Sequence, residues 1–277
     1  MEVKLINTGY FKLDGGAMFG VVPKVLWQKT NPADENNLCT WAMRSLVVMD
    51  GKKVILVDNG IGNKQSEKFF RHYYLHGDDS LSGNLHKLGL QEEDITDMML
   101  THLHFDHCGG GIKYEGERLV PTFPNATYWS NEAHWQWATH PNAREKASFL
   151  TENIIPMQES GHLRFVPLTG EHELPFEIIF VDGHTDKQML PKVKYKGHIL
   201  VFVADLIPSV GHIPLPYVMG YDTRPLLTLD EKARFLQEAA DNKYILVFQH
   251  DPVNECCTVK HTEKGVRVDE IFPFSAL

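Results

Sequence analysis

Six consecutive residues carry the densest group of metal-binding side chains in this sequence. His102, His104 and His107 supply three imidazoles and Asp106 supplies a carboxylate, directly after an apolar run from Met98 to Thr101. Such groups are costly to bury without partners, whereas both are ordinary ligands of first-row metal ions. An extended segment would point His102 and His104 to one side and leave Asp106 and His107 in the turn beyond it. The stretch therefore predicts two adjacent metal ions, each of which needs further ligands.

Three later apolar runs end in the same way, with a candidate ligand directly after a predicted buried strand. The runs and the ligands that follow them are 178–181 with His184, 199–204 with Asp205, and 244–249 with His250. Small-molecule and metal sites favour the carboxyl ends of strands, where loops present polar groups without burying them inside a sheet. These three residues are the expected additional ligands.

Together these seven residues resemble the ligand set of the metallo-β-lactamase superfamily, whose hallmark is an H-x-H-x-D-H motif. The resemblance runs from a hairpin at residues 45–57 through His250. It implies an α/β fold in the form of an αββα sandwich, with two mixed β-sheets flanked by helices. One ion would be held by His102, His104 and His184, the other by Asp106, His107 and His250, with Asp205 as the bridge. Two divalent ions are expected, zinc first, with iron, manganese or cobalt also suited to these donors.

The chemistry implied by this resemblance is hydrolysis of an ester. Two divalent ions lower the pKa of a shared water from about 15.7 toward about 7, which provides a bridging hydroxide at neutral pH. Asp106 is expected to be a ligand and also to carry a proton to the leaving group; a ligand role alone is the alternative. An N-acyl homoserine lactone is the first-choice substrate, and a phosphotriester or aryl ester is the second.

The segment from Asp14 to Lys24 indicates which branch of the superfamily the chain resembles. It is similar to the N-terminal segment of lactonase-like and organophosphate-hydrolase-like members. If this segment overhangs the metals, Met18, Phe19 and Trp27 would form an apolar wall for an acyl or aryl group. The alternative is that they anchor the segment in the core.

Two positions depart from the pattern of that branch. After Gly183-His184-Thr185 this chain has Asp186-Lys187, where many members have Pro-Gly. Pro208 stands where lactonases often place a tyrosine, three residues after the bridging aspartate. An oxyanion helper must then come from elsewhere, and His212 is the candidate. An exposed loop histidine is the alternative reading.

Two other classes of function were compared with hydrolysis. A flavodiiron-type oxidoreductase resembles H-x-E-x-D, but His104 stands at the glutamate position and no flavin-binding segment is appended. A non-catalytic binding relative would tend to have lost ligands, whereas this set is complete. Both observations favour the hydrolase.

Bulk properties set the remaining expectations. A formal net charge of −9 without a Lys/Arg run disfavours nucleic acid as a partner. Residues 1–5 lack a basic segment followed by a long apolar one, and no apolar run reaches membrane length, so a soluble cytoplasmic protein is expected. The four cysteines are expected to be structural thiols. Residues 1–277 are predicted to form one domain, and the resemblance suggests a homodimer.

Local patterns predict the elements that must hold these residues. Asp50-Gly51 predicts a hairpin turn between strands 43–49 and 53–57. Helical patterns cover 64–76, 84–88, 131–139 and 143–154, and Thr228 with Glu231 forms a capping box ahead of a helix that reaches Ala240. Gly109 to Gly111 indicate a tight backbone passage beneath the metals.

Overall fold

The computed structural model describes all residues from Met1 to Leu277 and divides them into two compact units. Unit 1 comprises residues 1–9 and 43–175, and unit 2 comprises residues 10–42 and 176–277. The chain passes between the units three times, within the long strands β1 (Glu2–Asp14) and β2 (Leu38–Asp50) and again between Pro175 and Phe176. That residues 1–277 act as one domain stays a prediction.

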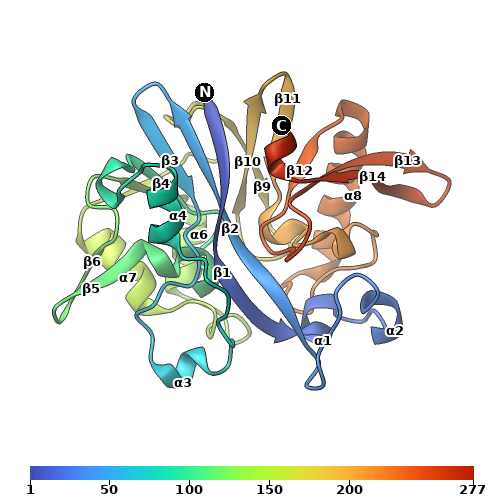
Figure 1. Ribbon diagram of the computed structural model, residues 1–277, viewed down its shortest axis with the longest axis horizontal. Coiled ribbons are helices and arrows are strands. Elements are labelled where there is room, and N and C mark those ends of the chain that lie inside the picture. Colours follow the sequence, from blue (N-terminus) through green and yellow to red (C-terminus); the bar gives the residue numbers. More distant parts are fainter. The chain divides into compact units, whose positions relative to one another are not determined.

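Unit 1 is built on a mixed sheet of order β1-β2-β3-β4-β7-β8 (Figure 1). After β2, its strands are β3 (Lys53–Val57), β4 (Asp97–Met99), β7 (Thr127–Ser130) and β8 (Leu163–Phe165). The predicted hairpin is confirmed, because β2 and β3 pair antiparallel around Gly51, whose φ of 60° suits glycine. The later neighbours pair in parallel, which brings their carboxyl ends to one edge. A separate hairpin consists of β5 (Ile112–Glu115) and β6 (Arg118–Pro121).

Short helices fill the connections between the strands of unit 1. They are α3 (Glu67–Phe70), α4 (Leu81–Lys87), η1 (Glu92–Asp94), α5 (Phe105–Cys108), η2 (Gly109–Gly111), α6 (Glu132–Thr139) and α7 (Thr151–Glu159). One hydrophobic core joins the sheet to these helices, with Leu56, Met98, Tyr128, Trp135 and Met157 among its buried members. This core supports the carboxyl end of β4, from which the H-x-H-x-D-H motif begins.

Two predicted helices of unit 1 have different bounds in the structure. The helix expected over 64–76 is only α3, because Ser66 caps it by accepting the amide of Phe69 and Tyr74 adopts a left-handed φ of 47°. The helix expected over 84–88 begins earlier, at Leu81, because the hydroxyl of Ser80 accepts the amide of Gly83.

The next two helix predictions had opposite outcomes. The helix expected over 131–139 is confirmed as α6, with Asn131 as its cap. The helix expected over 143–154 is wrong for its first half. The side chain of Asn142 accepts the amides of Arg144 and Glu145 and holds a turn there, and Leu150 is extended, so α7 starts only at Thr151.

Unit 2 contains a second mixed sheet, of order β14-β13-β12-β11-β10-β9. Its strands are β9 (Glu177–Val181), β10 (Gln188–Tyr195), β11 (His198–Phe202), β12 (Ile245–Val247), β13 (Cys256–Thr262) and β14 (Gly265–Phe272). Only β11 and β12 pair in parallel. The helical elements of the unit are α1 (Gly15–Phe19), α2 (Lys24–Trp27), η3 (Ala204–Leu206), η4 (Val210–His212), α8 (Pro225–Asn242) and η5 (Phe274–Ala276). Helix α8 packs against β13 and β14 (Figure 1).

The predicted capping box at the start of α8 is wrong. The helix begins one turn earlier, at Pro225, whose fixed φ suits the first helical position. Thr228 is therefore inside the helix. Glu231 has another role, because its two carboxylate oxygens accept the amides of Asp182 and Gly183 at 2.8 and 2.9 Å. A helix residue thus holds the loop that carries His184.

The glycine run after the motif packs tightly against a neighbouring loop, as predicted. A Cβ on Gly109 would lie 2.1 Å from the carbonyl oxygen of Ile61, and one on Gly110 would lie 2.3 Å from that of Asn59. The ammonium group of Lys64 also donates to the carbonyl of Gly109. No side chain fits between these backbones.

Replacing Gly109 with alanine is expected to destabilise the protein by roughly 3 kcal/mol or more, because backbone atoms must move to admit the methyl group. The control is Gly116→Ala, where the added Cβ meets nothing within 4 Å and only the φ of 63° opposes it. That change should cost about 1 kcal/mol. Urea unfolding of both variants measures the difference, and equal losses would contradict the steric explanation.

None of the helices combines the length and the apolar character needed to cross a membrane.

Candidate metal centre

The motif of unit 1 leaves the end of β4 and places two imidazole nitrogens face to face. His102 Nε2 lies 3.0 Å from His104 Nδ1, and both residues are buried. Helix α5 then turns Asp106 and His107 into the same region of unit 1, with Asp106 Oδ2 3.6 Å from His107 Nε2. The motif therefore gathers its four candidate ligands as two buried pairs.

The second nitrogen of each of these imidazoles is held by a neighbouring oxygen. His104 Nε2 lies 3.0 Å from Glu145 Oε1, and His107 Nδ1 lies 2.9 Å from Asp58 Oδ2. His102 Nδ1 lies 3.1 Å from the hydroxyl of Thr101, which itself donates to Asp58. A carboxylate has no proton to donate, and the hydroxyl of Thr101 already donates its proton to Asp58. Each imidazole must therefore donate its own proton to these oxygens.

This arrangement leaves two lone pairs facing one another. With their protons directed to Thr101 and Glu145, His102 Nε2 and His104 Nδ1 have no proton to share across 3.0 Å. Two facing lone pairs in a buried site repel unless a cation lies between them. In a tetrahedral zinc site with bonds of 2.0–2.1 Å, two ligand nitrogens are roughly 3.3 Å apart. The observed pair is close to that spacing.

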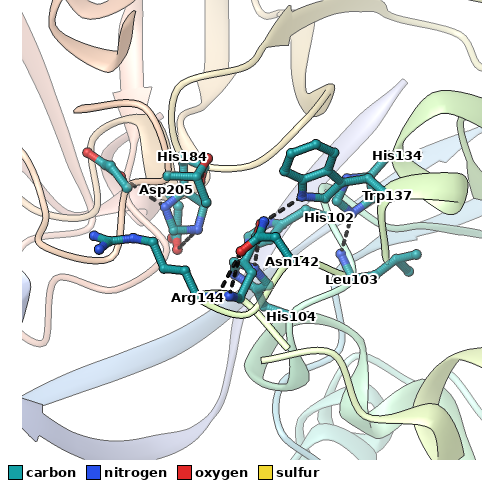
Figure 2. A network of polar contacts seen from close by, with 12 residues as sticks. His102, Leu103, His104, His134, Trp137, Asn142, Arg144, His184 and Asp205 are labelled. Atoms are coloured by element: carbon teal, nitrogen blue, oxygen red, sulfur yellow. Dashed lines mark hydrogen bonds and ion pairs between the residues drawn. The ribbon is translucent and has the colours of Figure 1, made fainter. Parts of the chain in front are cut away.

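In unit 2 a single carboxylate contacts two imidazoles through different oxygens. Asp205 Oδ2 lies 3.1 Å from His184 Nε2, and Asp205 Oδ1 lies 2.9 Å from His250 Nε2 (Figure 2 shows Asp205 with His184). Asp205 reaches this position from η3, which begins two residues after β11 with Ala204 in a left-handed conformation, φ 38°. A carboxylate that offers one oxygen to each of two histidine ligands has the form expected of a bridge.

The outer nitrogens in unit 2 are held as they are in unit 1. His184 Nδ1 lies 3.0 Å from the buried carboxylate of Asp222, and His250 Nδ1 lies 2.8 Å from the carbonyl of Ala42. Burial alone would lower the pKa of His184, but the carboxylates of Asp205 and Asp222 outweigh it and raise the pKa to about 10. A cation is favoured at His184 Nε2, and a proton takes that place when no metal is bound.

Charged side chains also fix the loop around His184, where the sequence departs from Pro-Gly. Lys187, with a left-handed φ of 52°, donates from its backbone and its ammonium group to Asp182. Arg224 donates to the carbonyl of Asp182 and pairs with Asp186 at 2.9 Å. These contacts, with those of Glu231, replace the rigidity that a proline would have provided.

The residues present fit divalent metal ions of the N/O-binding type. Each of the five imidazoles has one nitrogen anchored and presents the other, and the seven candidate ligand side chains are all buried. Anchoring of the outer nitrogen is the usual arrangement around metal-binding histidines, because it fixes the tautomer and orients the ring. Nitrogen and carboxylate donors suit zinc, iron, manganese and cobalt.

Comparison with known proteins agrees with this geometry. The family model described as the metallo-beta-lactamase superfamily matches residues 43–250. The chain belongs to this superfamily. The match contains the H-x-H-x-D-H motif, His184, Asp205 and His250.

Individual members of the superfamily resemble the chain over most of its length. An N-acyl homoserine lactonase of Bacillus thuringiensis is 23% identical over 212 residues, which cover 71% of this chain and 76% of the relative. A probable metal-dependent hydrolase from Staphylococcus aureus superposes with a TM-score of 0.88 at 28% identity, covering 100% of this chain and 98% of its own. The dizinc quorum-quenching lactonase AidC gives 0.78 at 23% identity, with coverage of 98% and 95%. The chain is a metal-dependent hydrolase with the metallo-β-lactamase fold, and the predicted fold class is confirmed.

Met18, Phe19 and Trp27 were predicted to form an apolar wall for the substrate, and in the structure all three are buried. Phe19 is 0% exposed and lies between two rings, stacked on Trp27 at 5.2 Å and on His212 at 4.3 Å. These side chains form a core within unit 2, as in the alternative reading, and a role as substrate wall would require the stack to open.

His212, the candidate oxyanion helper, is buried rather than exposed in a loop, and both of its ring nitrogens are hydrogen-bonded. Its Nε2 donates to the carbonyl of Met18 at 2.9 Å, and its Nδ1 accepts the hydroxyl of Ser209 at 2.8 Å. Burial lowers the pKa of His212 to about 3, so the ring is neutral. An oxyanion role would require one of these two bonds to break.

Four further residues around the ligands, Asp58, Glu145, Asp222 and His134, were not predicted from the sequence. Asp58 directly follows β3, so the strand-end pattern that identified Asp205 could have found it. Glu145 and Asp222 lie in loops without a motif. His134 accepts the amide of Leu103 at 2.9 Å, inside the H-x-H segment (Figure 2). No sequence signal separated these three from other buried polar residues.

Cys108, next to a candidate ligand, is a structural thiol as predicted. It is buried, its sulfur donates to the carbonyl of Leu103, and burial raises its pKa.

Proposed function

We propose that this protein is a dinuclear metal-dependent hydrolase that opens esters, with an N-acyl homoserine lactone as its substrate. The observation that carries the dinuclear part is the carboxylate of Asp205, which presents one oxygen to His184 and the other to His250. The names of its relatives support the lactone part, since both the curated relative from Bacillus thuringiensis and AidC are lactonases.

Under this proposal the seven candidate ligands act as one centre. One ion would be held by His102, His104 and His184 and the other by Asp106, His107 and His250, and Asp205 would be shared. Zinc is the first choice, because AidC is described as a dizinc enzyme. Iron, manganese and cobalt fit the same donors.

The chain's own groups then divide the work of ester opening. When bound, divalent ions at this centre would supply an activated water and polarise the carbonyl of the ester. Asp106 accepts the proton of that water and passes it to the departing alkoxide, for which its position at the first turn of α5 and its slight exposure are suited. The outer partners Asp58 and Asp222 hold His107 and His184 in fixed orientations throughout.

An apolar surface for the acyl chain is available beside Asp106 in unit 1. The ring of Phe105 lies 5.4 Å from that of Phe69 and 4.7 Å from that of Tyr73, and Phe70 packs edge-on against Phe69. Three of these four rings are partly exposed, unlike Phe19 and Trp27. Burial together with the Asp106 charge raises the pKa of Tyr73 to about 12, so its phenol stays neutral. We place the acyl chain on this aromatic cluster of Phe69, Phe70, Tyr73 and Phe105.

The test is a hydrolysis panel on metal-loaded protein, with lactones of increasing acyl length, aryl esters and phosphotriesters. Each methylene buried on the aromatic cluster contributes at most ~0.8 kcal/mol, so kcat/KM should rise by up to about fourfold per methylene across short to medium chains. Phe70→Ala should flatten that rise. Tyr114→Ala, at an exposed aromatic on β5, is the matched control and should leave the slope unchanged.

Efficient phosphotriester cleavage without lactone opening would reverse the choice of substrate and make the chain a phosphotriesterase. Aryl ester cleavage alone would make it an aryl esterase. Neither result would alter the ligand assignment. Equal slopes for Phe70→Ala and wild type would move the acyl chain away from this cluster.

Compartment and assembly complete the proposal. All four cysteines are buried thiols outside any disulfide, as suits a reducing compartment such as the cytoplasm. A homodimer rests on the family resemblance alone, and sedimentation velocity at micromolar concentration decides it.

A further inference from the structure

The loop between α6 and α7 encloses one of the candidate ligands, His104, and contains a buried glutamate. Glu145 is 3% exposed, and its Oε1 lies 3.0 Å from His104 Nε2. The ring of Phe149 lies 4.8 Å from that of His104, and the amide of Phe105 donates to the carbonyl of Ser148. The loop is therefore hydrogen-bonded to the motif at His104 and at the next residue, Phe105.

The other oxygen of Glu145 is also held. Its Oε2 accepts the indole N–H of Trp137 at 2.6 Å and the side-chain amide of Asn142 at 3.1 Å. Asn142 in turn accepts the backbone amide of Glu145, which fixes the turn (Figure 2 shows Trp137 and Asn142). Three donors converge on one carboxylate, so its orientation toward His104 is set before any ion arrives.

The bond to Glu145 decides which nitrogen His104 presents. Because the carboxylate accepts the proton of Nε2, the lone pair must lie on Nδ1, the nitrogen that faces His102 Nε2. A carboxylate acceptor also makes the imidazole a stronger donor to a metal than a neutral acceptor would. Of the three imidazoles in the motif, His104 and His107 have a carboxylate directly on the outer nitrogen, whereas His102 has a hydroxyl.

We infer that Glu145 is a positioning residue that fixes the Nε2–H tautomer of His104 and thereby sets how tightly the ion at His102 and His104 is retained. This inference rests on the metal centre of the proposed function but not on its substrate. Its action passes entirely through His104, so it should change metal retention rather than the chemistry of a fully loaded enzyme.

The test compares Glu145→Gln with wild type by metal analysis after equilibration against a series of chelator-buffered zinc concentrations. A glutamine must either offer its amide N–H₂ to His104, which reverses the tautomer, or lose the acceptor for Trp137. One of the two ions should then bind about 10–100-fold more weakly, as is typical when an outer partner is removed. The second ion should bind as in wild type, and kcat at saturating zinc should return to within a few-fold of wild type.

Glu117→Gln is the matched control, since it makes the same chemical change in an exposed turn of unit 1. Glu145→Asp is the second variant, because it keeps the charge but shortens the reach to His104. It should also weaken one ion by several-fold, even if Glu145→Gln does not fold. Nitrogen-15 NMR of the metal-free protein should show the Nε2–H tautomer of His104 in wild type and its reversal in a Glu145→Gln protein whose amide donates to His104.

Wild-type zinc retention in Glu145→Gln, or in Glu145→Asp if only that variant folds, would overturn the inference. So would equal weakening of both ions, which indicates a general loss of structure. A wild-type protein that binds one ion or none would instead contradict the dinuclear centre. Failure on lactones with normal zinc retention would contradict only the substrate.

Discussion

Asp205→Asn is expected to weaken metal binding by roughly 100-fold or more and to lower turnover by several orders of magnitude. The carboxylate offers Oδ2 to His184 and Oδ1 to His250, and its charge offsets that of the cations bound there. Asparagine keeps the shape but has a single oxygen and no charge, so it can serve only one of the two positions as an acceptor. Metal analysis and kcat at saturating zinc measure the two effects separately.

Asp241→Asn is the control for this change. Asp241 is an exposed aspartate of unit 2 that also pairs with a histidine, His261, at 2.7 Å. It should lose neither metal nor turnover, because an exposed pair contributes little. Near-native metal content and turnover in Asp205→Asn would refute the bridging role of Asp205.

The ligands could be found from sequence because each follows a strand that is apolar enough to recognise. His102, Asp205 and His250 are each the third residue after a short buried strand, and the carboxyl ends of such strands are where loops can present polar groups. The same pattern exists at Asp58, which follows β3 and orients His107. The strand-end rule thus identifies residues that contact a ligand and those that orient them, but it does not tell the two apart.

The residues that hold the ligands from outside could not be found, because their roles come from tertiary contacts. Glu145 reaches His104 only because Asn142 turns the chain where the sequence pattern predicted a helix. Glu231 looked like part of a capping box, but α8 starts at Pro225, which frees this carboxylate to bind the loop before His184. In the first case a local hydrogen bond, and in the second a proline, set the start of the helix at a different residue from the one that the sequence pattern predicted.

The aromatic residues of the N-terminal segment show a second limit of sequence reasoning. Phe19 and Trp27 have the size and spacing of a binding wall, yet they stack on each other and on His212. Apolar character identifies a residue that will be covered, and the sequence does not say whether the protein or a substrate covers it.

Removing the metal is expected to abolish hydrolysis and to lower the Tm by on the order of 10 °C, since an ion present at 1,000 times its Kd stabilises the folded state by about 4 kcal/mol. Added zinc should restore both. Chelator treatment followed by calorimetry and an activity assay measures the two effects. Activity that persists in fully stripped protein would argue against metal-activated water, and a Tm unchanged by stripping would argue against a site that binds in the folded state alone.

The binding of that metal should depend on pH in a direction fixed by His184. Burial lowers its pKa, but Asp205 and Asp222 raise it to about 10, so the metal-free protein carries a proton at Nε2 at neutral pH. Zinc must displace that proton, so the apparent affinity should rise by about tenfold per pH unit from pH 6.5 toward pH 9. In the metal-free protein the raised pKa stabilises the fold fully below about 6.5 and loses this contribution as the pH rises toward 10. Stripping should therefore be easiest at low pH, where the proton takes the place of the ion, and an affinity that does not change between pH 6.5 and 9 would contradict this exchange.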